Sequence, residues 1–200
     1  MTQDTFEFDP EAHRYRLNGA VIPWISFVLE KTGFVDKTWF RPEHADRGHA
    51  VHAACLYLIQ GDLDWSTVHP DLLPRIKGFE AFWQDLRRFA PTVLLAEKPL
   101  YSTVYQFAGT PDLAVEVREG VKVFDIKSGK SGLAAKIQTA AQAILIEERF
   151  GVKVVERYAL ELPEEGGYKL VKHDDRGDRT MFLNGLAMVN RRINEKELAI

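Results

Sequence analysis

Two strand-like runs near the middle of the chain constrain its fold more than any other feature of the sequence. The runs cover residues 106–117 and 121–127, and Glu119-Gly120 between them predicts a two-residue turn. With that turn, Leu113 faces Ile126 across an antiparallel hairpin. A shift of the register by one residue would set charged side chains against apolar ones, so the hydrophobic pattern favours this pairing.

The other face of the expected hairpin carries charge. Asp112 lies opposite Lys127, and Asp125 lies one diagonal step away. Two carboxylates about 4 Å apart repel each other by roughly 4 kcal/mol at an effective dielectric constant near 20. A divalent cation would relieve that repulsion, and oxygen ligands suit Mg²⁺ or Mn²⁺. The pattern therefore predicts metal-assisted hydrolysis of a phosphodiester, with the lysine stabilising charge on a phosphoryl oxygen.

The Asp-x-Lys pattern alone carries little information. Acidic residues number 29 in 200 positions, and about 1.7 acid-x-Lys triplets are expected by chance. On a strand, such a pair is usually solvated and contributes about 0–1 kcal/mol. The alternative for Asp125 and Lys127 is therefore a surface ion pair, and it is Asp112 at the same end of the hairpin that favours a metal site.

Helices and further strands surround this hairpin in the sequence. Asn18-Gly19 predicts the turn of an opening hairpin that runs from Phe6 to Ile25. Helical periodicity predicts helices over 42–59, 72–89, 133–150 and 179–198, and strands are expected over 93–100, 154–162 and 168–173. This order favours a mixed α/β domain with a largely antiparallel central hairpin over a doubly wound parallel sheet.

Composition excludes several classes of protein. Cys55 is the one cysteine, so the chain forms no intramolecular disulfide and no four-cysteine zinc or iron–sulfur site. The first residues show no secretory signal and no apolar run approaches a membrane span, so we expect a cytoplasmic protein without a membrane partner. The net charge of −3 argues against bulk coating of nucleic acid, but it leaves room for a local basic site.

Three motifs follow one another along the chain: Arg47-Gly48-His49-Ala50-Val51-His52, Gly109-Thr110-Pro111-Asp112 and Asp125-Ile126-Lys127-Ser128-Gly129. In this order they resemble the PD-(D/E)xK nuclease superfamily, in particular its RecB-type and phage recombination-exonuclease branches. The opening hairpin around His13 to Gly19 is similar to that of the phage-type members.

The resemblance implies roles for individual residues. The expected metal ligands are His52, Asp112, Asp125, the backbone carbonyl of Ile126 and, for a second metal or an outer position, Glu97. Lys127 would be the catalytic lysine. Gln138 matches the glutamine of the family's Gln-x-x-x-Tyr helix and would belong to the catalytic set, whereas Gln142 stands where the family has tyrosine.

The same resemblance implies a restriction-endonuclease-like core with a mixed central sheet flanked by helices. One nuclease domain would span residues 1–200, with an N-terminal hairpin and helices over 1–92, a catalytic core over 93–175 and a C-terminal helix over 176–200.

Lysines gather next to the expected site. Four of them lie between residues 122 and 136 against the single acid Asp125, and we expect Lys130 and Lys136 to bind substrate phosphates. The alternative is that these lysines serve only solubility.

The function expected on these grounds is a Mg²⁺- or Mn²⁺-dependent deoxyribonuclease, a phage- or prophage-type exonuclease in recombination or repair. DNA would be its partner, in the cytosol of a bacterial or phage-infected cell, with a homo-oligomer and a single-strand annealing or recombination protein as further partners. One alternative is an inactive module that keeps the fold to bind DNA or to assemble. Another is a hydrolase of RNA or of a different phosphodiester.

Overall fold

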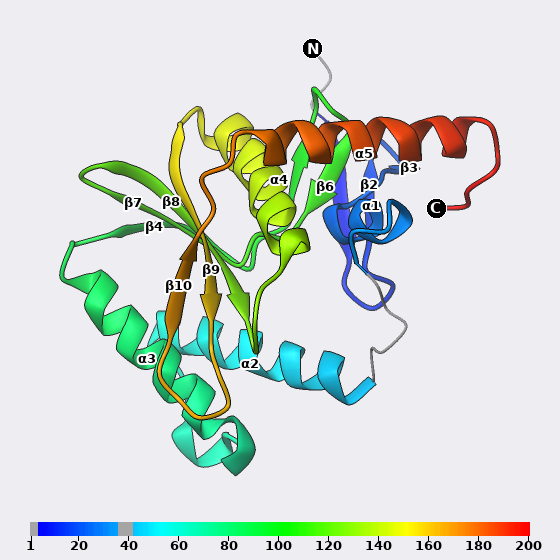
Figure 1. Cartoon of the computed structure of the whole chain (residues 1–200). Coiled ribbons are helices and arrows are strands. Elements are labelled where there is room, and N and C mark those ends of the chain that lie inside the picture. The colour runs from blue at the N-terminus through cyan, green and yellow to red at the C-terminus, as the bar shows by residue number, and fades with distance from the viewer. Residues whose placement is uncertain (1–3, 36–41) are drawn as a thin grey trace.

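A computed structural model describes residues 4–35 and 42–200 (Figure 1). Its largest sheet has five strands in the order β10-β9-β8-β7-β4. The strands are β4 (Thr92–Ala96), β7 (Leu113–Val117), β8 (Gly120–Lys127), β9 (Val154–Glu161) and β10 (Lys169–Lys172). The β8–β9 pair is parallel and the other pairs are antiparallel. The prediction of a mixed central sheet flanked by helices is confirmed.

Helices cover both faces of this sheet (Figure 1). They are α1 (Ile25–Lys31), α2 (Pro42–Gln60), α3 (Leu73–Arg87), α4 (Leu133–Phe150) and α5 (Gly177–Asn194), with short 3-10 turns at Trp65–Thr67 and Pro70–Leu72. One apolar cluster joins the sheet to α1, α4 and α5. A second joins the other face to α2 and α3. Both faces of the central strands are therefore buried.

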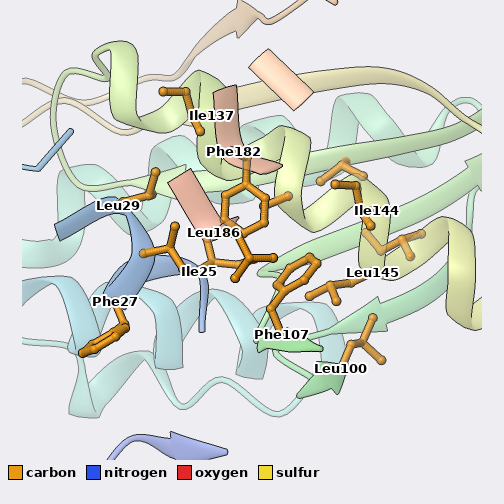
Figure 2. Close-up of a cluster of buried hydrophobic side chains, with 14 of the residues drawn as sticks. Ile25, Phe27, Leu29, Leu100, Phe107, Ile137, Ile144, Leu145, Phe182 and Leu186 are labelled. Carbon is orange, nitrogen blue, oxygen red and sulfur yellow. The ribbon is translucent and has the colours of Figure 1, made fainter. Parts of the chain in front are cut away.

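Helix α4 has the bounds that its periodicity predicts. Its buried face carries Ile137, Ala141, Ile144 and Leu145, which follow the spacing of an amphipathic helix. The helix ends at Gly151, whose left-handed φ of 66° lets its N–H donate to the Glu147 carbonyl. Figure 2 shows this face packed against side chains of α1, α5 and the strands around Phe107. Each fully buried aliphatic side chain there contributes about 1.5–3 kcal/mol, so the cluster fixes α4 over the sheet.

The opening hairpin is only partly as predicted. Asn18 and Gly19 form the expected turn, with φ values of 53° and 81°. The first arm, however, is two strands, β1 (Phe6–Asp9) and β2 (Arg14–Leu17), because the Asp9 carboxylate accepts from the backbone of Glu11 and closes a turn there. The second arm is only β3 (Ala20–Val21); residues 22–24 belong to no strand, and α1 begins at Ile25, where the predicted arm ends.

The register of the central hairpin differs from the predicted one. Leu113 pairs with Phe124 rather than Ile126, because the turn is Arg118-Glu119. Gly120 lies inside β8, where its φ of 125° suits glycine and not other residues. The offset is two residues, so every side chain keeps its expected face. Asp112 is therefore not placed opposite Lys127 by the strand pairing.

Two predicted strands are each divided between sheets. The run 106–117 contains β6 (Phe107–Gly109) and β7, with Pro111 at the break. The run 93–100 contains β4 and the first residue of β5 (Leu100–Ser102), with Pro99 before it. Proline has no N–H to donate to a ladder, so both prolines lie between strands rather than within one. β5 and β6 pair with each other in a separate two-stranded sheet. In residues 4–35 and 42–200, no helix has the length and apolarity that a membrane crossing requires.

Candidate metal centre

Three carboxylates meet at one edge of the central sheet. Glu97 follows the end of β4, Asp112 precedes the start of β7, and Asp125 lies near the end of β8. These strands are antiparallel neighbours, so these positions share one edge. The Glu97 N–H donates to the Asp112 carbonyl at 3.0 Å, which joins two of the segments directly.

His52 reaches this edge from α2. Its Nδ1 lies 2.8 Å from Glu97 Oε1 and 3.7 Å from Asp112 Oδ1, and its Nε2 lies 3.1 Å from the Ile126 carbonyl oxygen. Both ring nitrogens thus face acceptors, an arrangement that a protonated imidazole satisfies. Burial lowers the pKa of His52, but the nearby Asp112 and Glu97 carboxylates outweigh burial and raise it to about 9.

Asp112 is buried, with 5% of its surface exposed. Its Oδ2 accepts from the Ile126 N–H at 2.6 Å, which fixes the carboxylate against β8. Burial raises the pKa of Asp112 to about 7, and Asp125 and Glu97 add to that rise against the opposite effect of His52. The ionised carboxylate is therefore electrostatically unfavourable in this place unless a cation balances it.

Asp125 and Lys127 form a second part of the cluster. The fully buried Asp125 places Oδ2 2.7 Å from Lys127 Nζ, and its Oδ1 accepts from Gln142 Nε2 at 3.1 Å. Lys127 Nζ also donates to Gln138 Oε1 at 3.0 Å. Burial lowers the pKa of Lys127, but Asp125 and Asp112 outweigh it and raise that pKa, so the ammonium is charged.

The donor set fits a hard divalent cation. Within the described part of the chain, His52, Glu97 and Asp112 offer ligand atoms that all lie within 4.8 Å of one another. Two carboxylates and one imidazole, with the Ile126 carbonyl beside them, are ligands that Mg²⁺ and Mn²⁺ accept. The raised pKa values of His52 and Asp112 reflect an excess of negative charge that such an ion would neutralise.

The structure brings most of the predicted site residues together, but not in the predicted arrangement. Glu97, expected for a second metal or an outer position, lies with His52 and Asp112 in the group of possible ligands. Asp125 does not belong to that group, because Lys127 and Gln142 engage its oxygens. Lys130 and Lys136 are exposed, on the loop after β8 and on the first turns of α4.

Two contacts of the site were not predicted from the sequence. Gln142 binds Asp125 although it replaces an expected tyrosine; its position four residues after Gln138 is the signal, because such residues share a helix face. Glu161 Oε1 accepts from both the N–H and the hydroxyl of Ser131 at 2.6 Å and so holds the loop that leads into α4. Nothing in the local sequence around Glu161 marks that contact.

Comparison with known proteins adds little to this geometry. No protein-family model matches the chain, and no curated protein matches its sequence. Among solved structures, it is similar to one described as a "Putative exonuclease" from Eubacterium rectale, with 12% identity and a TM-score of 0.46 over 86% of this chain and 74% of the other. A likeness at that level does not assign a function, so the function rests on the site itself.

Proposed function

We propose that the chain is a divalent-metal-dependent nuclease with a PD-(D/E)xK core that hydrolyses phosphodiester bonds of DNA. The observation that carries this proposal is that the possible ligands His52, Glu97 and Asp112 lie at the same sheet edge as the Asp125–Lys127 ion pair. The Asp112 carboxylate is bonded to the N–H of Ile126, the residue between the two members of that pair. A purely structural ion pair would need neither the surplus carboxylates nor their burial.

The residues of the site divide the chemistry between them. His52, Glu97, Asp112 and the Ile126 carbonyl would hold the cation, which supplies Lewis acidity toward a phosphoryl oxygen when bound. Lys127, kept charged by Asp125, would donate a hydrogen bond to a non-bridging oxygen of the scissile phosphate as negative charge develops there.

Gln138 acts on Lys127 rather than on the phosphate in this scheme. Its Oε1 accepts from Nζ and, together with Asp125, fixes the direction of the ammonium. That arrangement meets the need for donors that are oriented before the reaction. The prediction that Asp125 is itself a metal ligand stays a prediction, since it requires one of its oxygens to leave Gln142 or Lys127.

The finer features of the proposal come from the family resemblance. They are a phage- or prophage-type exonuclease of recombination or repair, in a bacterial or phage-infected cytoplasm, that assembles with copies of itself and with an annealing or recombination protein. Lys130 and Lys136 would contact backbone phosphates from the loop after β8 and from α4.

A cleavage assay tests the proposal. Linear duplex, circular duplex and single-stranded DNA, with RNA alongside, are incubated with the protein in Mg²⁺, in Mn²⁺ and in a chelator. We expect DNA hydrolysis that needs the metal and that Asp112→Ala abolishes while the circular dichroism spectrum stays unchanged. DNA binding without cleavage would instead indicate an inactive module, and equal cleavage by Asp112→Ala would refute the assigned site.

A further inference from the structure

A pocket of about 200 Å³ adjoins the metal centre. It lies between the N-terminal sheet, the start of α1, the segment after β6, and α4. The side chains that give it its character are His13, Tyr15, Trp24, Thr110, Gln138 and Gln142. The last two also contact the Lys127 and Asp125 side chains, so the pocket and the cluster share a wall.

Gln142 brings an unsatisfied acceptor to this wall. Its side chain is buried, with 1% exposed, and its Nε2 donates to Asp125 Oδ1. An ionised carboxylate can only accept, so the amide nitrogen of Gln142 must face Asp125. The amide oxygen, Oε1, is then the atom of this group that Asp125 cannot bind. Oε1 has no hydrogen-bond partner among the described residues. A buried acceptor in that state costs about 1–3 kcal/mol. Because the oxygen has essentially no exposed surface, a ligand with a donor group would reach it only after the Gln142 side chain shifts.

Gln138 adds a donor one helical turn away. Its Oε1 accepts from Lys127 Nζ, so its Nε2 is the end left to face a ligand. Gln138 and Gln142 are four residues apart on α4 and therefore lie side by side. Together they offer a donor and, once the Gln142 side chain shifts, an acceptor, which match the mixed edge of an amide-like ring such as a nucleobase.

Aromatic side chains form the opposite part of the pocket. Trp24 is a partly exposed residue and His13 an exposed one, and the two rings lie edge to face with their centroids 6.1 Å apart. The Tyr15 hydroxyl is paired with Thr110 Oγ1 at 2.8 Å, which holds the floor of the pocket. The described lining contains no lysine, arginine or carboxylate, so it suits a neutral planar group rather than a phosphate.

We propose that this pocket binds the nucleobase next to the scissile phosphate, with the base against Trp24 and its polar edge toward Gln138 and Gln142. The inference rests on the proposed nuclease function and adds a base-binding position to it. Stacking of a base on an aromatic side chain is worth about 1–3 kcal/mol, and each 1.4 kcal/mol corresponds to a factor of about ten.

Oligonucleotides with one abasic site, moved stepwise past the cleaved bond, test the proposal in Mg²⁺. In the wild-type protein we expect kcat/KM to fall about tenfold or more when the abasic site reaches the pocket. Trp24→Ala should cut the intact and the abasic oligonucleotide at equal rates, whereas Trp24→Phe should restore the difference. Equal rates on both substrates for the wild-type protein would overturn the inference.

A binding experiment separates this inference from the nuclease proposal. Adenosine and thymidine contain no phosphodiester, and their quenching of tryptophan fluorescence is measured in chelator. We expect quenching at millimolar nucleoside in the wild-type protein and its loss in Trp24→Phe, which lacks the reporting indole. If the protein cuts no nucleic acid, quenching alone decides: its presence supports the pocket although the nuclease proposal has failed, and its absence refutes the pocket as well.

Discussion

Strand β8 carries a lysine–carboxylate ion pair at each end, and the two pairs differ in the burial of the carboxylate. At the start of the strand, Lys122 Nζ lies 2.8 Å from Glu156, and both side chains are 23% exposed. Lys172 binds the same carboxylate at 2.7 Å. At the other end, Lys127 Nζ lies 2.7 Å from Asp125 Oδ2; the lysine side chain is 29% exposed, whereas the aspartate is fully buried.

The charges balance differently at the two ends. Hydrogen bonds from Lys122 and Lys172 lower the pKa of Glu156 to about 2, because two ammonium groups stabilise the ionised form of one carboxylate. Burial, with Asp125 and Glu97 adding to it, raises the pKa of Asp112 to about 7 at the other end. Similar residues thus form a relaxed surface network in one place and a site that needs a cation in the other.

The largest expected effect is on cleavage by lysine variants. Lys127→Met should reduce the rate of metal-dependent hydrolysis about 10²–10³-fold, since an oriented donor to a developing charge is removed. Lys122→Met, on the same strand and also in an ion pair, should change the rate less than twofold. Initial rates on one DNA substrate measure both variants. Similar losses in the two would mean that the ends of β8 do not differ in the proposed way.

A second prediction concerns stability without metal. The raised pKa of Asp112 means that ionising its carboxyl group lowers the free energy of unfolding. This destabilisation is absent below about pH 4, where the group is protonated in both states, and is complete above about pH 7. Asp112→Asn removes the charge but leaves His52 with one partner fewer. We therefore expect a net gain of about 1–2 kcal/mol near pH 8.

Urea denaturation in chelator measures this gain. Glu156→Gln is the matched carboxylate-to-amide control and should show no gain, because its carboxylate is stabilised by two lysines. An Asp112→Asn protein less stable than the wild type would show that the carboxylate cluster is not strained.

The smallest effect belongs to Glu156. Glu156→Gln should lower the free energy of unfolding by about 0.5–1 kcal/mol near neutral pH, as is usual for solvated pairs. The lowered pKa places this contribution above about pH 4.5, and it is lost as the pH falls toward 2. Denaturant curves at several pH values should therefore converge for the two proteins in acid, and a difference that persists there would contradict the assignment.

The sequence predicted those features that local patterns determine. Helix α4 has its predicted bounds because its apolar spacing and Gly151 act within one element. The two-residue offset of the central hairpin was not predictable from alternation, since such an offset leaves every side chain on its face. The breaks at Pro99 and Pro111 mark points where the chain passes between sheets, and local alternation does not record which sheet a strand joins.

The site shows the same division. The motifs placed His52, Asp112 and Lys127 near one another, and the structure does bring them together. The burial of Asp125 was not visible in the sequence, because it depends on α4 covering that face of β8 and on Gln142. The choice between a surface pair and a functional cluster is therefore made by packing, as the two ends of β8 illustrate.

Manganese binding tests the central claim most directly. Isothermal titration with Mn²⁺, without any nucleic acid, compares the wild-type protein with Asp112→Asn and Glu156→Gln. We predict binding in the wild type and in Glu156→Gln, and its loss in Asp112→Asn, because only that variant removes a ligand from the buried cluster. Absence of binding in the wild type, or equal binding by Asp112→Asn, would contradict the account.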